Sequence, residues 1–469
     1  MQPKYLSAVF LLALSTGAIG QTTWYVDGIR GHNSNPGTSP TQAFATITQA
    51  LSYAGTGEVV YVLPGVYSAT NGESLPMQFT QGVTLLGADP RLVIIDAEYD
   101  PVAGTGHAGD ILKIKNNCLL SGVTVRNGAH GGNTGWWSGA VRIFDRPSID
   151  NVTVENCFFY NAARAIYVGW GGNGGEGISN VTIRNNLAFR CTADAIGMWG
   201  DNTGATVSSG NLIVNNTVIG VPTTGFTTRT AILLEHNVTA DVYNNNCYGY
   251  SRTGLEVGGG AGSTMNAGYN NLWDSTGKPL TMVNTVSTFN QAAPDTSSDP
   301  LLADALNGDP HLLEGSPCID AGDPSYLATM DIDGNGLQGQ AIDQGCDERM
   351  LNPLEIDMYF WSSVEAGATA EMKLLGKAGH GAAAYLSPGL SIVGPINLGS
   401  MGTLYIEPLT MILYAGAPTL GTGGVLAIPC PIPTSAEFLG IDIHFQSIGI
   451  DPSSLALGLS DLETVQIAD

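Results

Sequence analysis

The chain has 469 residues, of which 41 are acidic and 17 are basic, and its formal net charge at pH 7 is −24. This length favours several modules over one compact core. The sequence contains neither a basic patch nor a basic helix that could neutralise phosphates, which excludes nucleic acid as a partner. Polyanionic glycans are also repelled unless Ca²⁺ or a local basic strip bridges them, so a neutral polysaccharide or cell-surface glycan is favoured.

The N-terminal segment is typical of an export signal. Lys4 is followed by an apolar run from Leu6 to Leu14 and by small residues before a cleavage site near Gln21. We therefore assign residues 1–20 to a signal peptide and expect a secreted or cell-surface bacterial protein. The run is too short to span a bilayer, and no later stretch of about 18 apolar residues appears, which predicts that this is not an integral membrane protein.

The next segment, residues 21–67, is predicted to cap the fold that follows. Ala43, Ile47, Ala50, Leu51 and Ala54 lie on one face of a short predicted helix. Exposed terminal strands invite edge pairing, so such a helix would cover the open end of a stack of strands.

An asparagine then recurs at nearly constant spacing. The successive gaps are 29, 29, 30 and 29 residues, and an aliphatic residue stands two positions before each member. This is the signature of a repeat architecture in which every lap adds one supersecondary unit. Stacked amides can hydrogen-bond along the axis, so we expect a structural ladder. Its predicted members are Asn127, Asn156, Asn185, Asn215 and Asn244.

A second strand follows each asparagine and repeats the pattern small, aliphatic, variable, aliphatic. Ala165 to Val168 and Ala231 to Leu234 are two examples. The period of two indicates strands with one buried face, and about thirty residues are too few for two strands and a sizeable helix. The sequence therefore predicts an all-β chain with a parallel β-helix over residues 21–349.

The outward positions of these second strands form two predicted columns. One column contains Lys113, Arg142, Tyr167 and Glu256, and the other contains Trp199 and Glu235. Glycine-rich loops beside them carry aromatic residues and a histidine. Two interpretations remain open: the aromatic residues line a groove for an elongated glycan, or they pack the loops onto the coils. The predicted substrate-binding residues are His130, Trp136, Trp137, Tyr167, Trp170 and Trp199.

Two catalytic chemistries are compatible with these columns. The backbones of Glu235 and Glu256, one coil and two residues apart, would lie about 8 Å from each other. This separation permits an acid and a base in a glycoside hydrolase. Arg142 or Lys113 could instead remove the proton α to a uronate in a polysaccharide lyase assisted by Ca²⁺. The alternative for the glutamates is simple solvation on an acidic surface. Arg164 and Asp194, on neighbouring coils, are predicted to form a structural ion pair.

The segment from Asp331 to Gly336 resembles the start of a calcium loop. Asp331, Asp333 and Asn335 alternate, and Asp343 follows, but the glutamate expected at the twelfth position is missing. A structural Ca²⁺ and a plain turn are both compatible with this pattern, and Ca²⁺ is the one cofactor that the sequence suggests.

The chain contains seven cysteines. An exported protein can form disulfides, and Cys318 and Cys346 lie in two short matching motifs that should meet as the coil ends. We predict that these two residues pair, and we expect the protein to be a monomer.

The asparagine period stops before residue 353, and short apolar runs follow. Residues 355–469 are predicted to form a small C-terminal β-sandwich.

Several motifs resemble known families. Trp24 to Asp27, Val62 to Tyr67 and Gly82 to Gly87 resemble the opening of bacterial pectin-lyase-like β-helix proteins of the DUF1565 type. Residues 299–349, with Ile319 to Gly322 and Asp343 to Gly345, resemble the "choice-of-anchor Q" closing motif. The ending resembles a C-terminal domain of exported planctomycete-like proteins and implies a surface or sorting module.

The resemblance implies a secreted right-handed β-helix whose relatives include polysaccharide lyases and glycoside hydrolases, although many have no known activity. We therefore expect a protein that binds, and in one version cleaves, a polysaccharide on its outer face. The alternative is a noncatalytic surface or adhesion protein in which the β-helix is a stiff stalk and the C-terminal domain anchors or sorts it.

Overall fold

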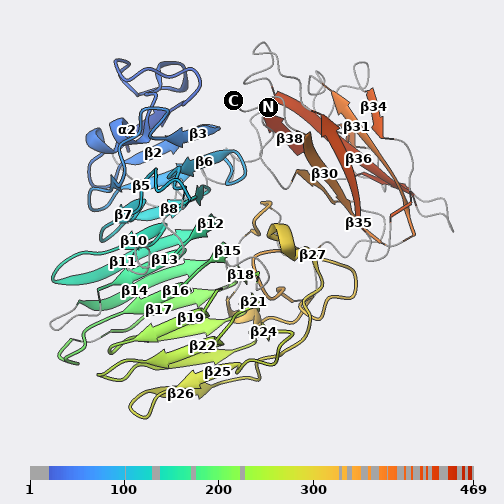
Figure 1. Cartoon of the computed structure of the whole chain (residues 1–469). Helices are drawn as coiled ribbons and strands as arrows, with labels where there is room; N and C mark the ends of the chain where they lie inside the picture. The colour runs from blue at the N-terminus through green and yellow to red at the C-terminus, as the bar shows by residue number, and fades with distance from the viewer. Residues whose placement is uncertain are drawn as a thin grey trace.

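The computed structural model describes residues 21–100, 102–128, 138–170, 176–206, 208–221, 228–326, 330–334 and 341–349, and strands and short segments between residues 357 and 466. The predicted signal peptide lies outside the described residues. Three long parallel sheets run side by side as a right-handed β-helix, which confirms the predicted fold (Figure 1). No helix in the described part of the chain is long and apolar enough to cross a membrane.

The first sheet contains the strands that precede the recurring asparagines. Its neighbours pair in parallel, so Val154 of one coil faces Ile183 of the next and Ile183 faces Ile213. In spatial order its ten strands are β1 (Thr23–Val26), β2 (Val59–Val62), β5 (Thr84–Gly87), β8 (Leu119–Ser121), β11 (Ser148–Glu155), β14 (Gly177–Arg184), β17 (Asn211–Val214), β20 (Thr239–Tyr243), β23 (Thr264–Gly268) and β26 (Thr288–Gln291).

The second sheet begins directly after the corner that each asparagine forms. A full coil contributes one strand to the first sheet, one to this sheet and one to the third sheet. Its eight strands are β3 (Gly65–Ser68), β6 (Val93–Asp96), β9 (Thr124–Arg126), β12 (Phe158–Ala162), β15 (Leu187–Cys191), β18 (Thr217–Ile219), β21 (Asn246–Tyr248) and β24 (Asn271–Trp273).

The third sheet carries the predicted columns of outward residues. Its eight strands are β4 (Met77–Gln78), β7 (Leu112–Ile114), β10 (Val141–Ile143), β13 (Ile166–Gly169), β16 (Asp194–Trp199), β19 (Thr230–Glu235), β22 (Thr253–Gly258) and β25 (Thr281–Val283). The aliphatic side chains of all three sheets that point inward form one continuous core along the axis.

The predicted cap helix is α2 (Ile47–Tyr53), preceded by a 3₁₀ turn, η1 (Pro40–Gln42). Ile47, Ala50 and Leu51 are buried against the first coil, as the apolar face predicts. The carboxylate of Glu73 accepts the backbone N–H groups of Ile47 and Thr48 at 2.6 and 2.9 Å. A side chain from the following coil thus satisfies orphan donors of the helix and ties the cap to the β-helix.

The recurring asparagines form the corners between the first and second sheets. All five have φ between +52° and +57°, a left-handed conformation that asparagine tolerates better than most residues. Asn185 donates to Asn156 at 2.7 Å, but Asn244 donates to the backbone of Asp323, and Asn215 has no side-chain hydrogen bond within the described part of the chain. The prediction of a continuous ladder through these five residues is therefore wrong. Asparagine recurs at these positions because it tolerates the positive φ that the corner requires.

The amide ladder lies one residue further along the chain. Asn186 donates to Asn216, Asn216 to Asn245 and Asn245 to Asn270 at 2.9–3.0 Å, and Asn270 ends the ladder on Asp295 at 2.9 Å. The four asparagines are at most 1% exposed. Each side chain also forms hydrogen bonds with backbone groups near the corner. The ladder thus satisfies buried polar groups that would otherwise destabilise the stack.

The closing segment, residues 299–349, returns along the outside of the second sheet (Figure 1). The backbone N–H of Gly345 donates to Asn244, Cys346 donates to Thr217, and Met330 accepts from Asn185. The segment thus runs back across several coils. It contains β27 (Leu302–Asp304), η4 (Ala305–Asn307), β28 (Asp309–Leu312) and η5 (Pro324–Tyr326).

The C-terminal strands form antiparallel sheets, as expected for this region. The first contains β29 (Asp357–Phe360), β30 (Thr369–Leu375) and β35 (Val425–Pro431). The second contains β34 (Ile412–Ala415), β31 (Gly381–Ser387), β36 (Asp442–Ile450), β37 (Leu457–Leu459) and β38 (Glu463–Gln466), and the third pairs β32 (Ile396–Asn397) with β33 (Thr403–Leu404).

A buried ionic network joins these regions. His311 of β28 places Nδ1 2.5 Å from Asp309 and Nε2 2.7 Å from Asp333. Asp333 also contacts Arg91 of an early coil at 3.3 Å, and Asp309 contacts Lys373 of β30 at 2.6 Å. Burial alone would lower the pKa of His311, but the carboxylates of Asp333 and Asp309 outweigh it and raise that pKa well above its usual value. His311 is therefore an imidazolium that holds the closing segment.

Adjacent asparagines provide a matched test of the two corner roles. We expect Asn215→Gly to change the free energy of unfolding by less than about 1 kcal/mol, because glycine accepts a positive φ. Asn216→Ala should cost about 2–4 kcal/mol because it leaves several buried groups unpaired. Urea unfolding followed by circular dichroism measures both. Asn290→Ala, at an exposed asparagine that bonds to Asn266, is the control. Equal costs at positions 215 and 216 would contradict the assignment.

The His311 network predicts a specific pH dependence. The folded-state pKa of His311 is raised, so its contribution to stability is fully present below the unfolded pKa of about 6.5 and is lost as the pH rises through the folded pKa. His311→Asn should lower the free energy of unfolding by about 3–5 kcal/mol at pH 6, and by less at alkaline pH. His32→Asn, at an exposed histidine, is the control. A cost for His311→Asn that is independent of pH would refute the imidazolium.

Candidate functional site on the third sheet

The two predicted outward columns are in register across the third sheet. Lys113 faces Arg142, Arg142 faces Tyr167, and Leu233 faces Glu256. In the other column Trp199 faces Glu235, and Glu235 faces Gly258. The repeated pattern thus placed these residues correctly on one face, because the period of two fixes which residues of each strand point outward.

The aromatic residues of these columns are buried. Tyr167 is 1% and Trp199 is 6% exposed, and together with Leu233 they form a small apolar cluster outside the sheet. The two rings meet edge to face at 4.6 Å. The prediction that Tyr167 and Trp199 are stacking surfaces for a glycan is therefore wrong, since neither ring presents a free face. They support the charged residues around them.

Trp170 is the described tryptophan that fits the groove hypothesis. It follows β13, is 53% exposed, and lies 6.4 Å from Phe144 between ring centroids. His130, Trp136 and Trp137 lie outside the described residues.

Arg142 lies at the basic end of the face. It is 4% exposed, and its guanidinium stacks over the ring of Tyr167 at 3.6 Å and lies 5.3 Å from the ring of Trp170. Burial lowers the pKa of Arg142, and the neighbouring Tyr167 and Asp110 only partly oppose this effect. Lys113, on the preceding coil, is half exposed and lies 3.8 Å from Asp110.

The predicted ion pair between Arg164 and Asp194 is confirmed. Their side chains meet at 3.2 Å in a buried position, and Arg229 approaches the other oxygen of Asp194 at 3.6 Å. Arg164 also lies over the rings of Tyr167 and Trp199 at 5.0 and 4.7 Å. This arrangement fixes the apolar cluster against the strands.

Glu235, at the end of β19, is partly exposed beside this cluster. Its Oε2 accepts the indole N–H of Trp199 at 3.0 Å, and the ring of His236 lies 3.7 Å from the same oxygen. Burial raises the pKa of Glu235, and the negative charge of Glu256 adds to the increase against the opposing effects of His236 and Trp199. A carboxyl group in this environment retains its proton at a higher pH than usual.

Glu256 has a different environment on the next coil. Arg252 contacts its Oε1 at 2.5 Å, and the hydroxyl of Thr230 donates to its Oε2 at 2.9 Å. The two glutamates are one coil and two residues apart, so their Cα atoms are separated by about 8 Å. The pKa of the Glu235 carboxyl group is raised by burial and Glu256 is paired with an arginine, so the two carboxyl groups have the different environments that acid and base catalysis uses.

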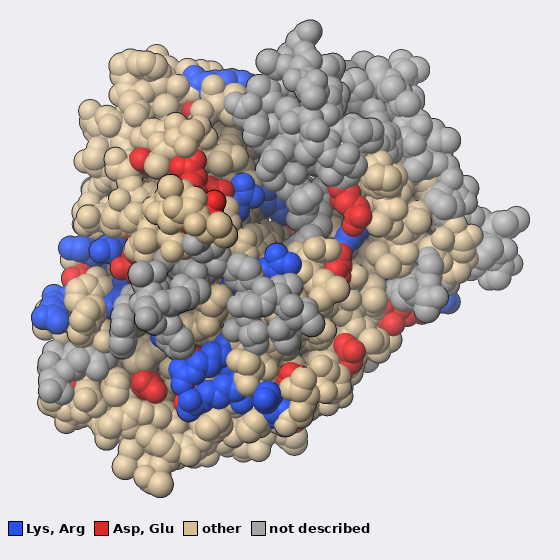
Figure 2. Space-filling model, in the orientation of Figure 1, with Lys and Arg blue, Asp and Glu red and all other residues tan. Residues whose placement is uncertain are grey.

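The partners of Glu256 were not predicted from the sequence. Thr230 begins β19 on the preceding coil, and Arg252 comes directly before β22 and reaches along this strand to Glu256. Figure 2 shows basic side chains gathered on this face near β19 and β22, and the side chains of Arg229 and Arg252 are 35% and 38% exposed. The acidic protein therefore carries a local basic strip beside its two glutamates.

The predicted calcium loop has no converging set of oxygens among its described residues. Asp331 accepts the backbone N–H groups of Asp333 and Glu348, and Asp343 accepts those of Asp320 and Arg349. Asp333 points to His311 and Arg91 instead. These carboxylates act as loop caps and as part of the ionic network, and Ca²⁺ binding by this loop stays a prediction. Asn335 lies outside the described residues.

The closing segment contains a second group of donor atoms, on His311, Asp333 and Asp347, that lie within 4.8 Å of one another. Both nitrogens of His311 already bond to carboxylates, so this group is better described as an ion network than as a metal site. Burial raises the pKa of Asp347 to about 7 and that of Glu348 to about 8.

The predicted disulfide is absent. Cys318 and Cys346 are both free and buried, as are the other five cysteines. Cys346 packs with Phe158 and Ile332 under the closing segment. The matching motifs do bring their backbones near one another, since Gln344 donates to the carbonyl of Cys318. The thiols serve as small apolar groups in separate packing positions.

Comparison with solved structures finds distant similarities. The chain resembles a rhamnogalacturonan lyase (15% identity, TM-score 0.38, 61% of this chain and 91% of that chain). It also resembles the pectate lyase Pel9A (16%, 0.36, 71% and 98%) and a GH136 lacto-N-biosidase from Eubacterium ramulus (11%, 0.36, 59% and 67%). The fold assignment stands on the strand pairing described above and does not depend on these similarities.

No curated protein matches the sequence. A family model described as "Protein of unknown function (DUF1565)" matches residues 29–300, which is more than half of the chain and includes every strand of the three parallel sheets except β1. The protein therefore belongs to the DUF1565 family.

Proposed function

We propose that this is an exported carbohydrate-binding β-helix protein that hydrolyses a polysaccharide on the outer face of its third sheet. One observation carries the proposal: Glu235, whose pKa burial raises, lies one coil from Glu256, which is paired with Arg252. Glu235 would protonate the glycosidic oxygen, and Glu256 would act as the base or nucleophile on the other side of the bond. The exposed ring of Trp170 on the same face would contact a neighbouring sugar.

A second candidate chemistry is elimination by a polysaccharide lyase. Burial lowers the pKa of Arg142, which favours a role as a general base, and Lys113 lies in register on the adjacent coil. Hydrolysis is better supported, because two carboxyl groups with different environments lie on one face. If the protein is instead a noncatalytic adhesion protein, neither the two glutamates nor Arg142 and Lys113 would cleave a glycan.

The products of a polysaccharide digest distinguish these functions. We would incubate the protein with neutral and acidic polysaccharides, with and without Ca²⁺, and analyse the released oligosaccharides by mass spectrometry. Hydrolysis predicts saturated products. Products lighter by one water would replace the proposal with the lyase, and the absence of products from all substrates would favour the adhesion role.

Glu235→Gln should lower kcat about 100- to 10,000-fold, because it removes the proposed acid while keeping the shape of the side chain. The control is Glu314→Gln, at an exposed glutamate of the closing segment. Folding would be checked by thermal unfolding. Unchanged turnover in Glu235→Gln would remove Glu235 from the mechanism.

The indole of Trp199 gives a more specific prediction. Its hydrogen bond lowers the pKa of Glu235 relative to what burial alone would produce. Trp199→Phe should therefore raise this pKa further and move the alkaline limb of the kcat/KM profile to higher pH. A downward shift, or a loss of rate without a change in the profile, would contradict the assignment of Glu235 as the acid.

A further inference from the structure

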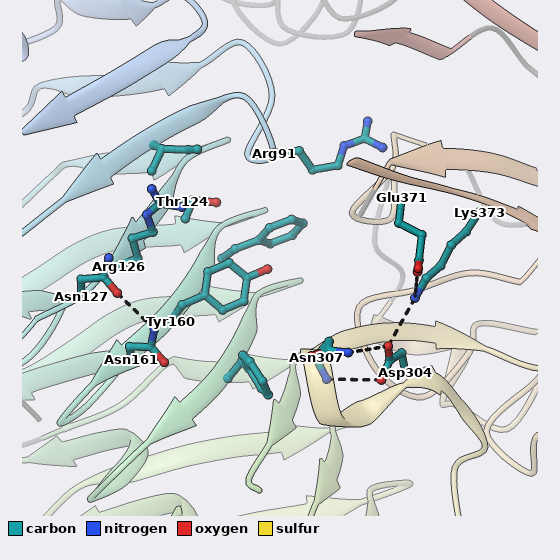
Figure 3. A pocket seen from close by; sticks show the side chains of 13 residues that line it. Arg91, Thr124, Arg126, Asn127, Tyr160, Asn161, Asp304, Asn307, Glu371 and Lys373 are labelled. Carbon is teal, nitrogen blue, oxygen red and sulfur yellow. Dashed lines mark hydrogen bonds and ion pairs between the residues drawn. The ribbon is translucent and has the colours of Figure 1, made fainter. Parts of the chain in front are cut away.

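A cavity of about 470 Å³ lies on the outer face of the second sheet, away from the glutamates. Three parts of the chain line it: early coils of the β-helix, the 3₁₀ turn of the closing segment, and strand β30 (Figure 3). The cavity therefore exists only where the closing segment and the C-terminal strands meet the β-helix. Its size lies within the usual range for small-ligand sites.

The floor of the cavity is aromatic. Phe158 and Tyr160 of β12 and Phe189 of β15 lie on the outer side of the sheet, and Tyr160 contacts both phenylalanines at centroid distances of 6.2 and 5.8 Å. Tyr160 is the partly exposed member of the three. Its hydroxyl points into the open space (Figure 3). Burial raises the pKa of Tyr160 well above its usual value, so the phenol remains neutral and can both donate and accept.

The rim is polar, and its cations are already paired. Arg126 contacts Asp96 at 2.7 Å, Arg91 contacts Asp89 at 2.9 Å, and Lys373 contacts Asp309 at 2.6 Å. The same rim carries the carboxylates of Asp304 and Glu371 and three side-chain amides. An anionic ligand would therefore compete with existing ion pairs and meet two carboxylates. The rim amides are Asn127, Asn161 and Asn307.

We propose that this cavity binds a neutral oligosaccharide of about two sugar rings, with Tyr160 as its central contact. The apolar face of a sugar ring suits the ring of Tyr160, the partly exposed aromatic residue of the floor, and the sugar hydroxyls suit the amides, which donate and accept, and the carboxylates, which accept. This site goes beyond the proposed hydrolysis, because it lies on another sheet and contains no residue of the third-sheet face. An oligosaccharide bound in this cavity would not be cleaved there.

The test measures binding of cellotetraose, xylotetraose, mannotetraose and tetragalacturonate to the full-length protein by isothermal titration calorimetry. We expect at least one neutral tetrasaccharide to bind, and Tyr160→Ala to weaken it more than tenfold. Asn307→Ala, at an exposed amide on the opposite rim, should weaken it several-fold without affecting folding. The acidic tetrasaccharide should bind more weakly than the neutral ones.

The matched control is Tyr248→Ala. Tyr248 lies in the same outward column of the second sheet as Tyr160, three coils further on and outside the cavity. Its loss should leave binding unchanged. Binding that survives both Tyr160→Ala and Asn307→Ala, a preference for tetragalacturonate, or no binding of any neutral probe would overturn the proposal. Binding that Trp170→Ala abolishes and Tyr160→Ala does not would belong to the third sheet, so the two sites fail independently.

Discussion

The structure depends on the pairing of each coil with the next. Parallel strands repeat the same position along the axis at about 4.8 Å, and the backbone groups of a strand pair with those of the neighbouring coils. The corner between the first and second sheets would interrupt this pairing. There a left-handed asparagine turns the chain, and on the coils with Asn186, Asn216 and Asn245 the following asparagine extends an amide ladder that also bonds to buried backbone carbonyls. The two adjacent residues thus solve a conformational problem and a hydrogen-bonding problem separately.

The same repetition gives the outer faces their chemistry. Side chains at equivalent positions form columns, so residues about thirty positions apart become neighbours at fixed spacing. On the third sheet this brings Glu235 and Glu256 together and lets one apolar cluster change the environment of Glu235. On the second sheet the returning closing segment covers part of a column and leaves a cavity above Tyr160. An ion network through His311 holds that cover in place.

Much of the fold was predictable because periodicity reports directly on register. The parallel β-helix, the cap helix, the outward columns and the pair of Arg164 with Asp194 all follow from spacing. Spacing does not distinguish Asn215 from Asn216, since one is selected by φ and the other by its buried amide. Nor does it report what covers a face: Tyr167 and Trp199 point outward and are nevertheless buried. The separate burial of Cys318 and Cys346 and the cavity at Tyr160 depend on the path of the closing segment, which has no period.

The most direct measurement of the central claim is a crystal structure of the Glu235→Gln variant with a fragment of the polysaccharide that the wild-type protein cleaves or binds. The account predicts a sugar chain across the third sheet, with the side chains at positions 235 and 256 on either side of one glycosidic bond and Trp170 against an adjacent ring. A fragment bound at another face, or bound on the third sheet with both carboxyl positions remote from every glycosidic oxygen, would contradict it.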